Sequence, residues 1–287
     1  MIKENEVYIS TGGFNLPGYQ FLEKYKNQKI NIELSGGKFH EKNDTKIIKL
    51  RKNNLKYRLH NYFPPPKNPF VLNLASSNNK ILNLSLKHIC KAIKLTSRIG
   101  AKYYSFHAGF LVDPMVDRLG KKFDLTKIQN RKNCLSNFRK NLLIVDTYAK
   151  SKNVKILIEN NVVTKKNLNV FGQNPFLLTN PKEILYFFSK LPKRIGLLVD
   201  VGHLNVSAKT ENFDRVKALK KIDKFVKGYH LSENNGISDS NKKINKNSWF
   251  LNYLKNDLDY YTIEVYDKPF SFLNKQAELV KKILNKQ

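Results

Sequence analysis

Cysteine, long apolar runs and acidic residues are all scarce in this chain of 287 residues. The two cysteines, Cys90 and Cys134, lie in segments with a helical pattern and lack metal-site spacing, so a reduced, cytoplasmic setting is predicted. No uninterrupted apolar run approaches the roughly 20 residues that a membrane span needs. The first residues, MIKENEVYIS, also lack the apolar centre of a signal peptide. We therefore expect no membrane association.

Basic residues outnumber acidic ones by 52 to 23, which gives a formal net charge of +29. Such a charge attracts anions and is often found in nucleic-acid-binding proteins. However, 44 of the basic residues are lysine, only 8 are arginine, and 35 asparagines accompany them. Lysine and asparagine share A/T-rich codons, and arginine is the residue that recognises phosphates and bases bidentately. A phosphorylated or nucleotide-linked small molecule is therefore expected ahead of nucleic acid.

Apolar stretches that suit buried parallel strands recur eight times, and helical patterns such as Leu84–Ile99 and Lys127–Ser151 lie between them. The predicted strands are Glu6–Thr11, Ile30–Ser35, Leu55–Phe63, Ala101–Gly109, Val154–Asn161, Arg194–His203, Val226–Glu233 and Tyr260–Asp267. This alternation predicts a single-domain (β/α)₈ TIM barrel over residues 1–287. An open doubly wound sheet is the alternative, but no G-x-G-x-x-G follows any predicted strand.

Three long connections, Phe110–Thr126, Val162–Asn180 and Asn234–Asn247, would leave the carboxyl ends of their strands, where barrel active sites lie. They are either lids over a site or tolerated insertions. Helix starts are expected at Pro181 and Pro269.

Residues that can bind a metal follow several of the predicted strands. They are His60, His107, Glu159, Asp200, His203, His230 and Glu264. The carboxyl ends of all barrel strands meet at one end of the barrel, so we expect these side chains to converge. Of the other histidines, His88 falls inside a helical pattern and is interpreted as structural or superficial, and His40 as solvated.

The strongest candidate metal ligands are Glu159, Asp200, His230 and Glu264, because they come from four successive strands. Three carboxylates and one imidazole form an oxygen-rich set that suits Mn²⁺, Co²⁺ or Mg²⁺, and Zn²⁺ is also compatible. A cation would offset the repulsion among three gathered carboxylates. His203, three residues after Asp200, would be a further ligand or a substrate contact.

Short segments at these strand ends resemble the xylose isomerase-like TIM-barrel superfamily. They are IELSGG (32–37), HNYFPPP (60–66), FHAG (106–109), IEN (158–160), DVGHLN (200–205), HLSENNG (230–236) and IEVYD (263–267). The superfamily includes sugar isomerases and epimerases, inosose dehydratases and the endonuclease IV group.

Resemblance to the sugar-epimerase branch implies a metal-dependent isomerase or epimerase that transfers a proton through a metal-bound enediolate. Glu159 and Glu264 would exchange the proton, and His203 would contact the substrate. Epimerases often carry a second glutamate after the fifth-strand ligand, where this chain reads NNVVTKKNLN. Substrate binding must therefore differ, and Lys165 or Lys166 becomes a candidate contact for an anionic group, with a solvated lysine as the alternative. His60 and His107 would line the pocket or close the barrel mouth by hydrogen bonding. The expected partner is a small carbohydrate, and a homodimer is left open.

Endonuclease IV, an abasic-site DNA nuclease with three zinc ions, is the related alternative. All seven strand-end residues would have counterparts there. The nuclease's Asp-x-His pair, however, would fall near Asp239 and Asn241, and asparagine is a poor zinc ligand. The fifth-strand sequence ENNVV also departs from the nuclease pattern. The sugar branch is therefore favoured, and a dehydratase acting at the same site stays open.

Overall fold

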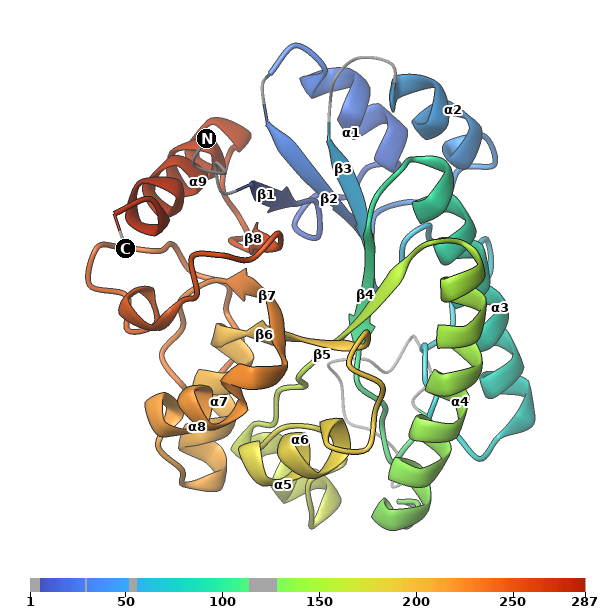
Figure 1. Cartoon of the computed structure of the whole chain (residues 1–287), viewed down its shortest axis with the longest axis vertical. Helices are drawn as coiled ribbons and strands as arrows, with labels where there is room; N and C mark the ends of the chain where they lie inside the picture. Colours follow the sequence, from blue (N-terminus) through green and yellow to red (C-terminus); the bar gives the residue numbers. More distant parts are fainter. Residues whose placement is uncertain (1–5, 29, 52–55, 114–127, 287) are drawn as a thin grey trace.

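Eight parallel strands, paired in chain order, close into a barrel in the computed structural model, which describes residues 6–28, 30–51, 56–113 and 128–286 (Figure 1). The strands are β1 (Val7–Ser10), β2 (Asn31–Ser35), β3 (Tyr57–His60), β4 (Tyr103–His107), β5 (Lys155–Glu159), β6 (Gly196–Asp200), β7 (Val226–Leu231) and β8 (Tyr261–Ile263). Pairing of β8 with β1 completes the ring, with Tyr8 opposite Thr262. The predicted (β/α)₈ barrel is confirmed, and the open sheet is excluded.

Helices lie outside the ring of strands (Figure 1). They are α1 (Gly18–Tyr25), α2 (Asn43–Leu50), α3 (Asn79–Arg98), α4 (Arg131–Ser151), α5 (Lys165–Phe171), α6 (Pro181–Phe188), α7 (Val201–Glu211), α8 (Arg215–Ile222) and α9 (Phe270–Leu284), with short 3₁₀ turns η3 (Asp223–Phe225) and η4 (Leu251–Tyr253). Both predicted helix starts are confirmed. The Asn180 side chain caps α6 by accepting the Glu183 N–H at 3.0 Å, and α9 follows Pro269 directly.

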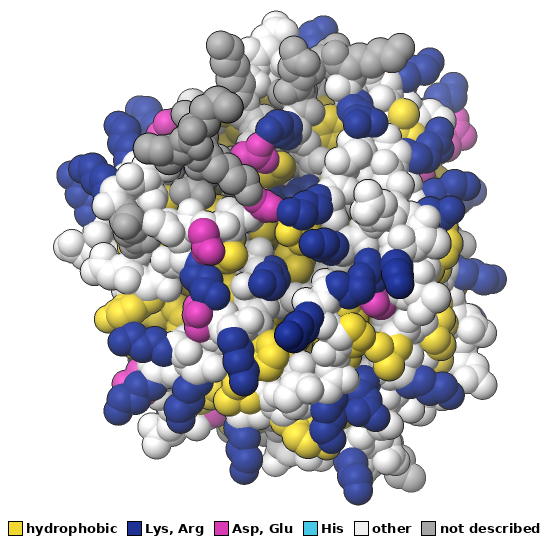
Figure 2. All heavy atoms as spheres, in the orientation of Figure 1, with side chains coloured by type: hydrophobic (Ala, Val, Ile, Leu, Met, Phe, Trp, Pro, Cys, Tyr) yellow, Lys and Arg dark blue, Asp and Glu magenta, His cyan; other side chains and the backbone are white. Residues whose placement is uncertain are grey.

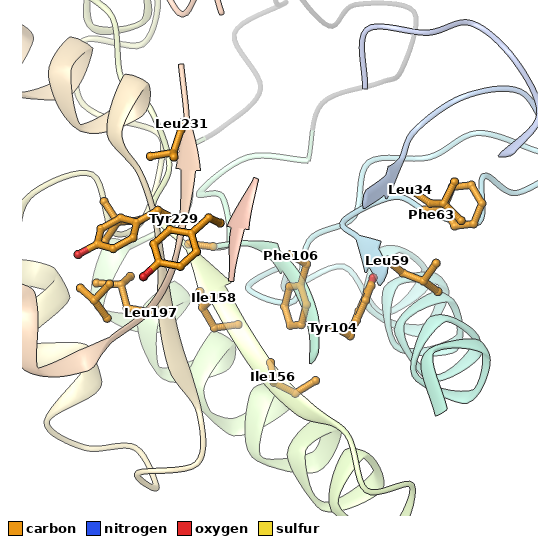
Figure 3. Close-up of a cluster of buried hydrophobic side chains, with 14 of the residues drawn as sticks. Leu34, Leu59, Phe63, Tyr104, Phe106, Ile156, Ile158, Leu197, Tyr229 and Leu231 are labelled. Atoms are coloured by element: carbon orange, nitrogen blue, oxygen red, sulfur yellow. The ribbon is translucent and has the colours of Figure 1, made fainter. Parts of the chain in front are cut away.

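Alternation along each strand separates an apolar outer face from a more polar barrel interior. Outward-facing residues pack with the helices in one continuous core. Figure 3 labels ten residues of this core: Leu34, Leu59, Phe63, Tyr104, Phe106, Ile156, Ile158, Leu197, Tyr229 and Leu231. Inside the barrel, Leu157, Leu198 and Tyr260 form a separate small apolar cluster. Glu159 and Asp200 come two residues after the two leucines, so this cluster lies directly beneath the strand-end side chains.

Several predicted strands are longer than the observed ones, and two of the differences between predicted and observed segments have a local cause. The sixth strand ends at Asp200, not at His203, because the Asp200 side chain accepts the His203 N–H at 2.8 Å and starts α7 there. The connection 162–180 contains α5, which begins with a capping box between Thr164 and Asn167. The predicted connection Phe110–Thr126 lies outside the described residues from 114 onward.

The basic excess is visible on the face of the molecule that Figure 2 shows. Figure 2 shows lysine and arginine side chains across the whole visible face, with few acidic side chains between them. In the described parts of the chain, no helix has the length and apolar character of a membrane span.

His88 is a buried histidine of α3 that should make the protein acid-sensitive. Its ring stacks on Tyr62 with centroids 5.2 Å apart, and burial lowers its pKa to about 4. An unfolded histidine titrates near 6.5, so the stabilisation is complete above that pH and is lost as the pH falls towards 4. Between pH 7 and 5 the expected loss is about 2 kcal/mol. The variant His88→Phe should show a correspondingly smaller difference between urea unfolding at pH 7 and at pH 5; an unchanged difference would contradict this assignment.

Candidate metal centre

The predicted metal-binding side chains converge at the carboxyl end of the barrel. His60, His107, Glu159 and Asp200 are the last residues of β3 to β6, His230 lies near the end of β7, and Glu264 follows β8. His203 joins them from the first turn of α7. Parallel strands in one barrel bring these residues together although they are spread over more than 200 positions of the chain.

One ligand group consists of Glu159, Asp200, His230 and Glu264, whose candidate ligand atoms all lie within 4.8 Å of one another. His230 Nδ1 lies 2.8 Å from Glu264 Oε2 and 3.3 Å from Glu159 Oε1. Both carboxylate oxygens of Glu159 and Oδ2 of Asp200 are buried without a hydrogen-bond partner among the described residues. Buried carboxylates left without donors are costly, and a divalent cation would satisfy them. These residues therefore fit a metal.

A second ligand group shares Glu159 with the first. It joins Glu159 to His60 and His107. His60 Nε2 lies 3.2 Å from Glu159 Oε2, and His107 Nδ1 lies 3.6 Å from the same oxygen. The two groups meet at one carboxylate, so Glu159 is common to both.

The pKa values of the three carboxylates in the first group shift in different directions. Burial raises the pKa of Glu159 and Glu264, but facing histidines outweigh it; the pKa of Glu159 falls well below its usual range and that of Glu264 falls to about 2. Asp200 behaves in the opposite way. Burial and the charges of Asp239, Glu264 and Glu159 hold its pKa well above the ordinary value. In the metal-free protein, the charge of Asp200 is therefore the least compensated of the three.

His203 lies between the first group and the loop after β7. Its Nδ1 is 2.8 Å from the carbonyl oxygen of Asn160, which can only accept, so Nδ1 carries the proton. Its Nε2 then faces Asp239 Oδ2 at 3.2 Å. Burial opposes the charge on His203, but Asp200 and Asp239 raise its pKa well above the usual value. Asn241 is close by, and its carbonyl accepts the Tyr266 N–H at 3.0 Å.

A cavity of about 290 Å³ opens above the site, near the lower limit for small-molecule pockets. His107, His203 and Glu264 reach it together with Asp239, Asn241 and Tyr266, while Phe110 and Phe176 form an apolar wall. The rings of Phe110 and Phe176 pack edge to face with centroids 5.7 Å apart. Two predicted contacts lie outside this lining: His60 is buried below the cavity, and Lys165 is exposed at the start of α5.

The structure adds residues that the sequence did not single out. Glu33 of β2 is fully buried, with Oε1 2.9 Å from His230 Nε2. Burial opposes its ionisation, but His230, His60 and Arg58 lower its pKa to about 2. Tyr266 donates a hydrogen bond to Glu264 Oε1 at 2.6 Å. Glu33 carries the same signal as Glu159, an acidic residue within an apolar strand; Tyr266 lies in a loop and carries no such signal.

Residues 18–267 match the family model described as the xylose isomerase-like TIM barrel. The chain belongs to this family. The matched residues include the whole of the strands β2 to β8 and therefore every candidate ligand of this xylose isomerase-like chain.

Two relatives share about a quarter of the aligned residues with this chain. An uncharacterized protein of Methanocaldococcus jannaschii is 26% identical over 269 residues, which cover 92% of each chain. A probable endonuclease 4 of Thermosipho africanus is also 26% identical, over 185 residues that cover 62% of this chain and 57% of the endonuclease.

Among solved structures, a D-tagatose 3-epimerase-like protein superposes with a TM-score of 0.73 at 20% identity, covering 98% of this chain and 97% of its own. The D-psicose 3-epimerase of Clostridium cellulolyticum H10, crystallised with D-tagatose, gives a TM-score of 0.66 at 11% identity with 98% of both chains covered. At these identities the likeness establishes the fold.

Proposed function

We propose that this xylose isomerase-like protein is a divalent-metal-dependent isomerase or epimerase of a small carbohydrate. The observation that carries the proposal is the oxygen-rich ligand group, in which Glu159, Asp200, Glu264 and one imidazole surround a single point beneath a small cavity. Such an oxygen-rich donor set suits Mn²⁺, Co²⁺ or Mg²⁺. Structural zinc sites, in contrast, are rich in sulfur and nitrogen donors. The similar structures of a D-tagatose 3-epimerase-like protein and a D-psicose 3-epimerase support the same reaction class.

When bound, the metal would supply positive charge that acidifies a C–H bond beside the substrate's oxygens. The chain's own carboxylates would move the proton. Glu264 is 7% exposed and reaches the cavity, and Glu159 lies fully buried beneath it. Tyr266 holds Glu264 Oε1, so the Oε2 atom is directed towards His230 and the ligand group. His203 and Asp239 border the same cavity and would bind substrate hydroxyls.

Exchange of substrate hydrogen with solvent tests this function. Metal-loaded protein in D₂O should incorporate deuterium at the carbon beside the carbonyl of a ketose or aldose, detected by NMR over a panel of free and phosphorylated sugars. Glu264→Gln should lower the exchange by about 10²- to 10⁴-fold because it removes one proton-transfer group. Glu23→Gln, an exposed change on α1, is the matched control and should exchange at the wild-type rate. An active Glu264→Gln protein would refute the role of Glu264.

An abasic-site nuclease is the second candidate, favoured by the His60–His107–Glu159 group and by the probable endonuclease 4 among the relatives. Several metal positions around Glu159 would suit phosphodiester cleavage, in which two metals commonly stabilise the attacking and leaving oxygens. Incision of a duplex with one abasic site, abolished by a chelator and falling steeply with salt, would establish it. The Asn241 amide, in place of a histidine beside Asp239, favours the carbohydrate reaction.

A further inference from the structure

We infer that Glu33 is a positioning residue that sets the proton positions of His60 and His230, and thereby turns one lone pair from each ring towards a ligand group. The inference rests on the metal centre proposed above, although it holds for a sugar enzyme and for a nuclease alike. Glu33 is one strand away from His60 and is fully buried inside the barrel. Its carboxylate forms a further candidate group with His60 and His230, and it faces the His230 ring from the side opposite Glu159.

The surroundings of Glu33 favour an ionised carboxylate that only accepts hydrogen bonds. Its Oε2 accepts the hydroxyl of Tyr260 and, at 3.0 Å, that of Thr262. Arg58 Nε lies 3.3 Å from the same oxygen. The Arg58 guanidinium is itself held between the rings of Tyr8 and Tyr260, 3.6 and 3.4 Å from their centroids. A carboxylate with these donors around it has no proton of its own to give.

On one side Glu33 faces His230 directly. Its Oε1 lies 2.9 Å from His230 Nε2, and neither atom has another hydrogen-bond partner among the described residues. In the metal-free protein His230 Nδ1 hydrogen-bonds Glu264 Oε2 at 2.8 Å. When a cation in the ligand group takes the lone pair of Nδ1, the one proton of the neutral ring belongs on Nε2, facing Glu33. Its Nδ1 then presents a lone pair towards Glu159 and Glu264, at 3.3 and 2.8 Å. A carboxylate behind a ligand histidine is a common means of orienting the ring.

On the other side Glu33 acts through a chain of hydroxyl groups. The Tyr260 hydroxyl gives its single proton to Glu33, so at 2.6 Å it must accept the proton of Ser105 Oγ. Ser105 Oγ, having donated, must in turn accept from His60 Nδ1 at 2.8 Å. The proton of His60 is therefore on Nδ1. Its Nε2 presents a lone pair towards Glu159, 3.2 Å away.

The two histidines are thus expected to be opposite tautomers. His60 carries its proton on Nδ1 and His230 on Nε2, although both rings face the same Glu159. One carboxylate determines both. Without it, Tyr260 could reverse its hydroxyl, and each imidazole could place a proton in the ligand group, where it would exclude a cation.

The test is ¹⁵N-edited NMR of the histidine rings in Zn²⁺-loaded protein, combined with Zn²⁺ affinity measured by competition with a chromogenic chelator. Wild-type protein should show a protonated Nδ1 for His60 and a protonated Nε2 for His230. Glu33→Gln should disturb both ring patterns and weaken Zn²⁺ binding about 10- to 100-fold, the range for residues that support ligands. Tyr260→Phe removes only the hydroxyl relay, so it should alter the His60 pattern and leave that of His230 unchanged.

Glu183→Gln is the matched control, because Glu183 of α6 is a mostly buried carboxylate that pairs with Arg131 outside the barrel interior. It should lower stability without moving the histidine signals or the Zn²⁺ affinity. If wild-type protein binds no Zn²⁺, Mn²⁺ or Co²⁺, both the metal centre and this inference fail. If wild-type protein binds Zn²⁺ and Glu33→Gln binds it equally well, or if both histidines show the same tautomer, only the inference fails.

Discussion

Replacing Glu159 with glutamine is expected to remove metal from both ligand groups and to lower turnover by about 10²- to 10⁴-fold. Glu159 is the residue that the two groups share, and each of its oxygens faces a histidine: Oε1 faces His230 at 3.3 Å and Oε2 faces His60 at 3.2 Å. An amide offers only one oxygen and no charge. Its NH₂ group would also donate hydrogen bonds to the ring nitrogens, and these bonds would occupy the lone pairs that a cation needs.

Metal content after dialysis of Mn²⁺- or Zn²⁺-loaded protein gives the first measurement, and deuterium incorporation into substrate gives the second. Glu183→Gln again serves as the control, since it removes a carboxylate that pairs with Arg131 and leaves the barrel mouth unchanged. Retention of wild-type metal by Glu159→Gln would show that the two groups do not bind through Glu159.

The barrel itself could be predicted because its signals are local and repeated. Each strand is a short apolar run, and each outer face packs against the next helix in one continuous core. The strand-end ligands could be predicted for the same reason: the carboxyl ends of all barrel strands meet at one end, so residues as distant as His60 and Glu264 converge without any sequence proximity.

The interior layer could not be predicted in the same way. Glu33 was visible as an acidic residue in an apolar strand, but its partners Tyr260 and Thr262 are more than 220 positions away. Their hydrogen bonds depend on the closure of β8 onto β1, which in turn pairs with β2, and a linear pattern does not encode this closure. The apolar pattern places the end of β6 too late in the sequence. The Asp200 side chain accepts the His203 N–H and starts α7 there, although the residues that follow continue the apolar pattern of the strand.

Lys165 is a predicted contact that does not line the cavity. Its place in the connection after β5 suggested an anion contact, yet it begins α5 and is exposed outside the lining of the cavity. The role of Lys165 therefore stays a prediction. The polar side chains that do reach the cavity next to His203 are Asp239 and Asn241, from the connection after β7.

Replacing Asp200 with asparagine should have two opposite effects, because this carboxylate suits a metal and burdens the metal-free protein. Burial and the charges of Asp239, Glu264 and Glu159 raise its pKa in the folded protein, so its contribution to stability falls as the pH rises above the ordinary carboxyl value. Asparagine removes the charge and still caps α7, where Asp200 accepts the His203 N–H. At pH 7 the chelated Asp200→Asn protein should be more stable than chelated wild type by about 1 to 3 kcal/mol.

With metal present the order should reverse. The variant lacks a charged ligand, so its Zn²⁺ affinity should fall by more than about 100-fold, beyond the effect of residues that only support ligands. Wild-type protein, in contrast, should gain about 4 kcal/mol when metal is held at 1,000 times its dissociation constant. Urea unfolding with chelator measures the stability of the metal-free proteins, and urea unfolding with metal measures the stabilisation that the metal adds. Asp146→Asn is the matched control, because Asp146 is paired with Arg194 and its loss should destabilise the protein with or without metal. A chelated Asp200→Asn protein less stable than wild type would mean that the Asp200 charge is already compensated by His203 and needs no cation.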